Sequence, residues 1–576
     1  PGEAKKGIFL AKIAASRAAG KFADLRADGY LIVEDKGDIL IAGIDDTGPR
    51  TDIAQKLTEI DKAGYEQQKK LMNEDAWSFQ CGTLFGVYRF LESLGVRFFF
   101  AGPHGERVPK CTAISFQKSI IENPYFLYRN VGAMHRAPWF YVKNESVNPK
   151  RDLEELTELK YTPAQGVLWG LRMRMSMTPF PLQHHPSSVD YKGRFGKSHP
   201  EYFAYYAGRR LVDANSPTFR DQLCYSNLEL QDIIFGEIKS FADGKSAESY
   251  GIPSKVTDKY PNFRGWYPAL ASNGIFSVLP NDSFIGCECD KCKQLNEKTD
   301  VPYGQKNSRR LWTFVETMAE RLKQERVKVK ISCLAYDSYT IPYPGMRKLP
   351  DNVIVGFCAN VLNRPYMLYT NDNYQKFVRL VEQWDQLSDE SMAFWMHFLY
   401  RWGRPESYAV AIHIPHMHEK VLDVMAKHGK WATIQVNEDS VFFEIFTRYF
   451  LMKKLYDPSV NADELFQDYI VQFYGPGAEE IGAIYTDIEK QNIGFLSKNA
   501  GRSEIWDNYF SPEVLKGYRT RWAKAMAATE GTEYRMNVEL FGKYYLGLLE
   551  NGQADFDKNL RQVMKNPASK SSFCEL

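Results

Sequence analysis

A series of short apolar runs between residues 123 and 440 constrains the fold more than any other feature of the chain. The runs are rich in β-branched and aromatic side chains, as buried strands are, and they recur roughly every 25 to 60 residues with helical or irregular sequence between them. The eight runs are Tyr128–Gly132, Trp169–Met175, Asp221–Tyr225, Ile275–Leu279, Val329–Tyr336, Val353–Phe357, Met392–Phe398 and Ala432–Val436. Eight strands that alternate with helices predict an α/β fold with a central (β/α)8 TIM barrel.

The segments on either side of the barrel predict two further regions. Residues 1–122 predict a small α/β domain, with a hairpin of Tyr30–Val33 and Asp38–Ile44 and an amphipathic helix over Gly82–Gly95. Residues 441–576 read as helices throughout, with a helix start at Asn461. No run of about eighteen apolar residues occurs, so no membrane span is predicted.

An Asn-Asp pair, Asn281 and Asp282, follows the C-terminal end of the run Ile275–Leu279. Three cysteines follow within the next ten residues, at positions 287, 289 and 292. A carboxylate at a strand end, on a loop pinned by thiols, has the rigid mounting that a catalytic group requires. Asp282 is therefore the first candidate catalytic residue.

Reactive groups of a (β/α)8 barrel lie where strands end, so the strand ends give an inventory of the site. The catalytic candidates are Asp282, Asp337 and Glu438, with Glu201 on the loop after the second predicted strand. The substrate-binding candidates are Arg129, His184, His185, Asn281, Tyr336, His397, Tyr400, Arg401 and Trp402. Each carboxylate has an alternative role as a loop cap or an ion-pair partner. The alternative role of Glu201 is that of a carboxylate at a helix start, where it accepts hydrogen bonds from free backbone N–H groups.

Composition narrows the class of ligand. The 73 Lys and Arg residues nearly balance the 71 Asp and Glu residues, which argues against nucleic acid and acidic membrane surfaces. Aromatic residues make up 14% of the chain, and flat aromatic faces suit sugar rings as well as large cores. Carboxylates, amides and imidazoles without a phosphate-binding glycine loop therefore favour a neutral, polyhydroxylated substrate, and glycoside hydrolysis needs one carboxylic acid plus a second carboxylate or a substrate acetamide.

The cysteines Cys287, Cys289 and Cys292, joined by Cys224 at the end of the third predicted strand, allow three states. They can bind a structural zinc ion, form disulfides or remain reduced. Each of these states is structural, so no cofactor is expected to take part in catalysis.

Several motifs resemble known families. Gly82-Thr-Leu-Phe-Gly-Val-Tyr-Arg-Phe-Leu-Glu-Ser-Leu-Gly, followed by Gly105-Glu-Arg-Val-Pro, resembles the small domain that precedes the barrel in α-glucuronidases and β-hexosaminidases. His199–Ala204, Gln222–Asn227 and Pro280–Ser283 with the cysteine triplet resemble barrel proteins of unknown function (DUF-type) from polysaccharide-utilising bacteria. Some of those are classed in glycoside hydrolase family 163, which are endo-acting β-N-acetylglucosaminidases.

The resemblance implies an exported glycoside hydrolase that acts on an oligosaccharide or glycoprotein glycan, in the periplasm or at the cell surface. The chain begins at Pro1 without an initiator Met, which is expected where a signal peptide has been removed. The predicted mechanism is retaining hydrolysis of a β-linked N-acetylhexosamine, with attack by the substrate acetamide. An α-glucuronidase-like enzyme, with Arg364 and Arg401 binding a uronate, is one alternative, and a non-catalytic carbohydrate-binding barrel is another.

Overall fold

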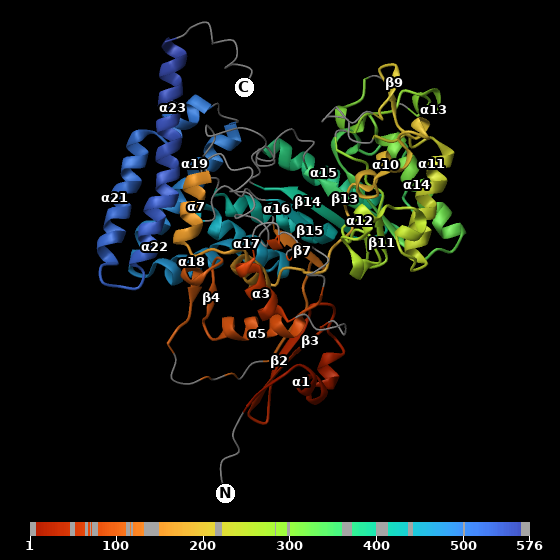
Figure 1. Cartoon of the computed structure of the whole chain (residues 1–576). Coiled ribbons are helices and arrows are strands. Elements are labelled where there is room, and N and C mark those ends of the chain that lie inside the picture. The colour runs from red at the N-terminus through yellow and green to blue at the C-terminus, as the bar shows by residue number, and fades with distance from the viewer. Residues whose placement is uncertain are drawn as a thin grey trace.

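The computed structural model places a twisted central sheet between three groups of helices and a small N-terminal domain (Figure 1). It describes residues 7–45, 52–63, 67–68, 71, 79–110, 114, 116, 119–131, 149–212, 222–282, 284–295, 300–359, 371–398, 413–435, 442–498 and 502–565. The predicted domain boundaries after residues 122 and 440 stay predictions.

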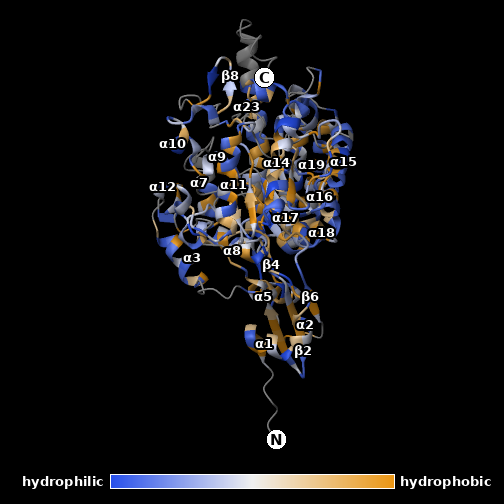
Figure 2. Ribbon diagram, turned by 90° about the vertical axis from the view of Figure 1, so that its right-hand side faces the viewer, coloured by the Kyte–Doolittle hydropathy of each residue, from blue (hydrophilic) through white to orange (hydrophobic). Residues whose placement is uncertain are grey.

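The N-terminal domain is a four-stranded sheet with a helix on each face. Its strands are β1 (Ile8–Leu10), β2 (Tyr30–Asp35), β3 (Asp38–Gly43) and β6 (Ile120–Glu122), in the order β1-β3-β2-β6. Alternate side chains of β2 face opposite ways, so Leu31 and Val33 pack on the side of α1 (Ala11–Arg17), whereas Tyr30 and Ile32 join the main core beside α5 (Gly82–Ser93). The predicted hairpin and helix are confirmed, and Figure 2 shows these apolar strands.

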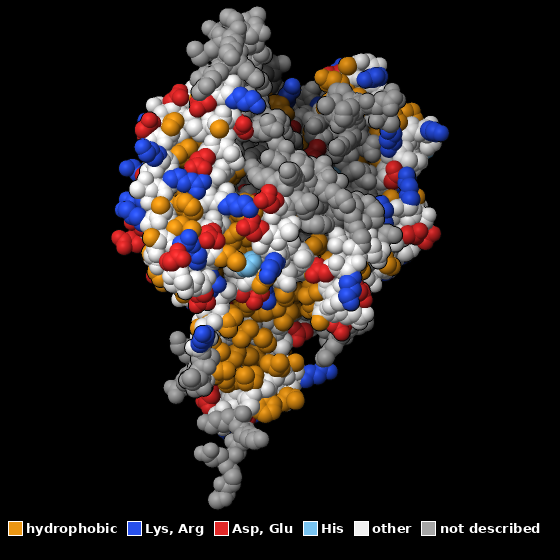
Figure 3. All heavy atoms as spheres, turned by 60° about the vertical axis from the view of Figure 1, so that its left-hand side comes forward, with side chains coloured by type: hydrophobic (Ala, Val, Ile, Leu, Met, Phe, Trp, Pro, Cys, Tyr) orange, Lys and Arg blue, Asp and Glu red, His pale blue; other side chains and the backbone are white. Residues whose placement is uncertain are grey.

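Glycine permits the close approach of α5 to this sheet. A Cβ atom on Gly43 would lie 2.1 Å from the carbonyl carbon of Gly82, and one on Gly86 would lie 2.9 Å from Ile41. The helix therefore rests directly on the strand backbone. Elsewhere the N-terminal domain exposes large apolar side chains, including Ile13 and Val108, and Figure 3 shows apolar side chains gathered on one face of it.

Six of the eight predicted barrel strands form one parallel sheet. They are β11 (Ile275–Ser277), β12 (Lys330–Ala335), β13 (Val353–Cys358), β14 (Met392–His397), β15 (Gly429–Gln435) and β7 (Tyr128–Val131), with the short β10 (Ala271–Ser272) antiparallel at the edge. The strands β12 and β13 are buried almost throughout, as strands covered on both faces are. Helices α11 (Leu228–Ala242), α14 (Ser308–Gln324), α15 (Asn371–Gln386) and α16 (Pro415–His428) lie between or beside these strands (Figure 1).

Two predicted strands are wrong. Trp169–Met175 begins inside a helix, α8 (Pro163–Arg172), because Thr162 caps the N-terminus through Gln165 N and Pro163 fits the first helical position. In Asp221–Tyr225 the described residues make only an isolated antiparallel bridge, between Leu223 and Phe203. The structure therefore shows a curled, half-barrel sheet of seven strands, and the predicted closed eight-stranded barrel is not shown.

An extended segment after α8 connects the two edges of this sheet. Ser176 N donates to Arg129 O of β7, and Leu182 N donates to Ala269 O beside β10. His184 then forms a parallel bridge with Leu279, just beyond β11. The segment thus occupies the position of the missing second strand without a continuous ladder, and it brings His184 beside the end of β11.

The C-terminal region is helical, as predicted, and it packs against both other regions. Its helix α17 (Ile445–Tyr456) is buried almost throughout and packs against β7, α16 and α18 (Ala462–Tyr474). The helices α19 (Ala478–Lys498), α21 (Pro512–Ala528), α22 (Arg535–Leu540) and α23 (Gly547–Lys565) complete the region. Asn461 caps α18 by accepting from Glu464 N at 3.1 Å, which confirms the predicted helix start. Among the described helices, none is both long and apolar enough to cross a membrane.

Candidate active site

Asp282 lies just beyond the C-terminal end of β11, on a backbone that its neighbours hold in place. The amide nitrogen Nε2 of Gln222 donates to the backbone oxygen of Asp282 at 2.8 Å. The preceding Asn281 is buried, and its Oδ1 accepts from the hydroxyl of Ser187 at 3.0 Å. The Asp282 side chain itself is 48% exposed, so a fixed backbone presents an accessible carboxyl group.

One partner of this carboxyl group is His184. Its Nε2 lies 3.3 Å from Asp282 Oδ2, and its Nδ1 lies 2.6 Å from the carbonyl oxygen of Pro280. A carbonyl oxygen only accepts, so Nδ1 carries a proton and donates it to Pro280. The pair therefore places an imidazole nitrogen beside an exposed carboxyl group, an arrangement that can transfer a proton.

His397 ends β14 and acts on the same carboxyl group through space. Burial lowers the pKa of His397 to about 4, and the charge of Asp282 opposes part of that shift. His397 is therefore neutral at neutral pH, and its ring lies within electrostatic range of Asp282. Asp282, His184 and His397 are the predicted site residues that the structure brings together.

Two other predicted binding residues lie in the core. His185 is completely buried, and its Nε2 lies 2.8 Å from Glu237 Oε2 of α11, where Tyr191 also donates. Arg129 is also completely buried and donates to Asp28 of the N-terminal domain at 2.9 Å. The side chains of both residues serve packing between elements, so the structure does not bring them to Asp282.

The remaining described carboxylates have local partners. Asp337 follows β12, and both of its side-chain oxygens accept from the Tyr303 hydroxyl, at 3.0 and 3.1 Å, while the neighbouring Tyr336 ring packs edge-on against Tyr339. Glu201 is 44% exposed and lies 3.0 Å from His199 Nδ1. Its own backbone N–H and His199 lower the pKa of Glu201, which fits the alternative role of a carboxylate at a helix start.

Some predicted residues lie outside the described part of the chain. These are Glu438, Tyr400, Arg401, Trp402 and Arg364. All of them follow the C-terminal ends of β13, β14 or β15, so their part in the site stays a prediction.

The four cysteines predicted as a cluster do converge. Cys224, Cys287, Cys289 and Cys292 bring their sulfur atoms within 4.8 Å of one another. Cys224 Sγ lies 3.5 Å from Cys287 Sγ, 3.7 Å from Cys289 Sγ and 3.9 Å from Cys292 Sγ. None of these distances is that of a disulfide, which is about 2.05 Å, and the set could bind a metal ion.

Sequence reasoning missed Gln222, Ser187 and Glu237. Gln222 stands two residues before Cys224, yet its importance comes from a contact with Asp282, sixty positions away. Ser187 and Glu237 act in the same way, through Asn281 and His185. Only the spacing Gln222-x-Cys224 beside a predicted metal ligand could have drawn attention to any of them.

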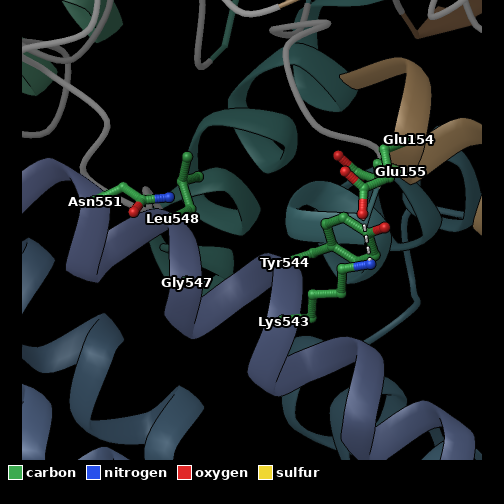
Figure 4. Close-up of a pocket in the computed structure, with 7 residues that line it drawn as sticks. All are labelled: Glu154, Glu155, Lys543, Tyr544, Gly547, Leu548 and Asn551. Atoms are coloured by element: carbon green, nitrogen blue, oxygen red, sulfur yellow. Dashed lines mark hydrogen bonds and ion pairs between the residues drawn. The ribbon is translucent and has the colours of Figure 1, made fainter. Parts of the chain in front are cut away.

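A small cavity lies elsewhere, between α7 (Pro149–Glu158) and the last helices. Its volume is about 110 Å³, and Lys543 donates across it to Glu154 at 2.9 Å (Figure 4). Its lining is Glu154, Glu155, Lys543, Tyr544, Gly547, Leu548 and Asn551, which includes none of the candidate site residues. The cavity is far smaller than the roughly 300 to 1,000 Å³ of ordinary ligand pockets, so we do not assign it to the site.

Residues 269–487 match the protein family described as "Domain of unknown function (DUF4838)". This stretch contains β10 to β15, Asp282 and three of the four clustered cysteines. The similarity to barrel proteins of unknown function is thus confirmed there, whereas similarity to glycoside hydrolase family 163 stays a prediction. Among curated proteins, none matches the chain.

Several solved structures of glycoside hydrolases are similar to the chain at low identity. One is the family GH115 4-O-methyl-α-glucuronidase BtGH115A, which is 12% identical with a TM-score of 0.43, and the match covers 95% of this chain and 66% of that chain. Another is CpGH84B, which is 11% identical with a TM-score of 0.36, and the match covers 99% of this chain and 86% of that chain. A family 89 glycoside hydrolase from Clostridium perfringens is 10% identical with a TM-score of 0.37, and the match covers 81% of this chain and 49% of that chain. The chain spans less than two thirds of the length of BtGH115A, and similarities this distant carry no argument about activity.

Proposed function

We propose that the protein is a glycoside hydrolase that acts on β-linked N-acetylglucosamine in an oligosaccharide or glycoprotein glycan. The observation that carries the proposal is the pairing of Asp282 with His184 at the end of β11. Enzymes with parallel sheets of this kind place reactive groups at the carboxyl ends of the strands. An exposed carboxyl group with an imidazole nitrogen beside it there is suited to general acid catalysis.

In this mechanism the Asp282–His184 pair donates a proton to the glycosidic oxygen as the bond to the anomeric carbon breaks. Pro280 O holds the His184 ring, so Nε2 stays directed at Asp282 and the proton has a fixed path. The substrate acetamide attacks the anomeric carbon, and Asp337, Glu201 or Glu438 is the candidate for the carboxylate that orients it. The chemistry uses no cofactor, and a zinc ion in the cysteine cluster would be structural.

The test is turnover of a glycan that carries β-linked N-acetylglucosamine. We expect Asp282→Asn to lower kcat at least about 10²-fold, the scale of losing an acid or an orienting carboxylate, with the fold intact by circular dichroism. Asp258→Asn, a change at an exposed position after α12 (Ser254–Thr257), is the matched control and should keep the wild-type rate. A folded Asp282→Asn protein with unchanged turnover would remove Asp282 from the mechanism.

The same assay separates the alternative functions. Turnover confined to uronic-acid substrates would favour an α-glucuronidase-like enzyme, in which Arg364 and Arg401 bind the carboxylate. Binding of the glycan without turnover would favour a carbohydrate-binding barrel. Export to the periplasm or the cell surface is part of the proposal, and fractionation of the native host would test it.

A further inference from the structure

We infer that Cys224, Cys287, Cys289 and Cys292 form a four-thiolate zinc site that fixes the loop carrying Asp282. A tetrahedral zinc ion with bonds of about 2.3 Å places its sulfur ligands about 3.8 Å apart. Cys224 Sγ lies 3.5, 3.7 and 3.9 Å from the other three sulfur atoms, which matches this geometry. Two disulfides would need separations near 2.05 Å.

The surroundings of the sulfur atoms support the same assignment. Cys224, Cys287 and Cys292 are buried, which excludes competing water. The backbone N–H of Tyr205 donates to Cys287 Sγ at 3.2 Å, and the Ser226 hydroxyl lies 2.9 Å from Cys292 Sγ. Such outer contacts orient thiolate ligands and disperse their charge.

A buried cation offsets part of the charge of the site. Zinc with four thiolates carries a net charge of −2, which is costly to bury alone. Arg310 of α14 is buried and donates to the backbone oxygen of Cys292 at 3.5 Å. Its guanidinium therefore lies beside the ligand-bearing helix α13 (Asp290–Lys293), where it opposes the excess negative charge.

The cluster joins three segments that surround the candidate active site. Cys224 N donates to Tyr202 O, next to Glu201, and Gln222 on the same segment donates to Asp282 O. Glu288 N, between two ligands, donates to Tyr205 O at 2.6 Å. One ion would thus fix the loop after β11, the segment before α11 and the strand β8 (Tyr205–Tyr206), none of which has a long ladder of its own.

The first test uses the wild-type full chain, purified without chelator. Elemental analysis should find one zinc per chain, and replacement by Co²⁺ should give the visible absorption of a tetrahedral thiolate site. All nine cysteines should titrate as thiols after denaturation with a chelator. Stoichiometric iron, no stoichiometric metal, or four cysteines missing from the thiol count would each overturn the assignment.

A pair of variants localises the ion. Cys292→Ser should lose most of the bound zinc, and Cys81→Ser, which removes a buried thiol of the N-terminal domain, should keep it. Full retention of zinc by Cys292→Ser would contradict the site. Because metal content is measured without substrate, failure of this inference is distinguishable from failure of the proposed hydrolase activity, and the wild-type measurement stands even if Cys292→Ser does not fold.

Discussion

The adjacent residues His184 and His185 have side chains that point to different parts of the molecule. His184 reaches Asp282, whereas His185 points to Glu237 in the core, because the chain turns at this point: His184 still bridges Leu279, and His185 begins the short helix α9 (His185–Ser188). The sequence predicted that both histidines bind substrate, since nothing in His184-His185-Pro186 indicates which side chain faces the ends of the strands. A buried partner such as Glu237, fifty-two positions away, becomes visible only once the chain is folded.

The contact between Asp282 and His184 leads to a prediction for His184. His184→Asn removes an imidazole that can exchange a proton with the carboxyl group of Asp282. We expect kcat/KM at pH 7 to fall about 10- to 100-fold and the shape of its pH profile to change, because a group that takes part in proton transfer is lost. A variant that loses activity equally at every pH would indicate a purely structural role for His184.

Among the secondary-structure elements, the predicted strands that the structure confirms are mostly the buried ones. The strands β12, β13 and β14 were recognised because each is an apolar run that is mostly buried, whereas β15 is only half-buried. The run Trp169–Met175 is also rich in apolar residues, although it includes Arg172 and Arg174, but it belongs largely to α8, whose Thr162-Pro163 start was the stronger signal. Apolar content alone cannot separate a buried helix from a buried strand.

The cysteine cluster shows the same limit. The spacing of Cys287, Cys289 and Cys292 identified three members, and Cys224 was included only by its place near a predicted strand end. The choice between metal and disulfide depends on sulfur separations of 3.5 to 3.9 Å, which no spacing specifies. Candidates on the loops after β13 to β15, Glu438 among them, lie outside the described residues and stay predictions.

A buried histidine before α16 gives a pH-dependent prediction. His413 packs against Phe446 of α17, Phe466 of α18 and Tyr485 of α19, and burial, with smaller contributions from His418 and His416, lowers its pKa to about 3. The unfolded chain binds a proton at this residue near pH 6.5, but the folded chain does not until about pH 3. Stability should therefore fall as the pH drops through this window.

His413→Phe removes this titration and keeps an aromatic ring. We expect the free energy of unfolding, measured with urea, to fall less between pH 6.5 and 4.5 than in the wild type, by about 2 to 3 kcal/mol. Thr317→Ser, a change without titration at an exposed position of α14, is the control and should follow the wild-type curve. Parallel curves for wild type and His413→Phe would show that His413 does not couple folding to pH.

Across the whole molecule, buried and partly buried ion pairs connect regions that are far apart in sequence. Arg129 of the central sheet pairs with Asp28, and Arg97 of the N-terminal domain pairs with Asp468 of α18 at 2.7 Å. Glu92 of α5 joins all three regions, because it binds Arg174 at 3.0 Å and also the ammonium of Lys453 on α17. The relative placement of the regions therefore depends on charge as well as on apolar packing.

Glu92 is the strongest test of this arrangement. Burial alone would raise the pKa of Glu92, but Arg174 and Lys453 lower it to about 2, so the carboxylate stabilises the fold above about pH 4.5. Glu92→Gln leaves two buried cations without a counter-charge, and we expect it to cost about 3 to 5 kcal/mol at pH 7. The difference from wild type should shrink as the pH falls from about 4.5 toward 2, because the wild-type carboxylate then gains its proton.

The measurement is urea unfolding of the full chain, with Glu320→Gln on the exposed face of α14 as the control that should leave stability within about 0.5 kcal/mol of wild type. In the double variant Glu92→Gln/Lys453→Met one uncompensated cation is removed, so part of the lost stability should return. If Glu92→Gln unfolds like Glu320→Gln at pH 7, the ion cluster does not hold the three regions together, and their apolar contacts, such as the Tyr30–Tyr456 stack, must suffice.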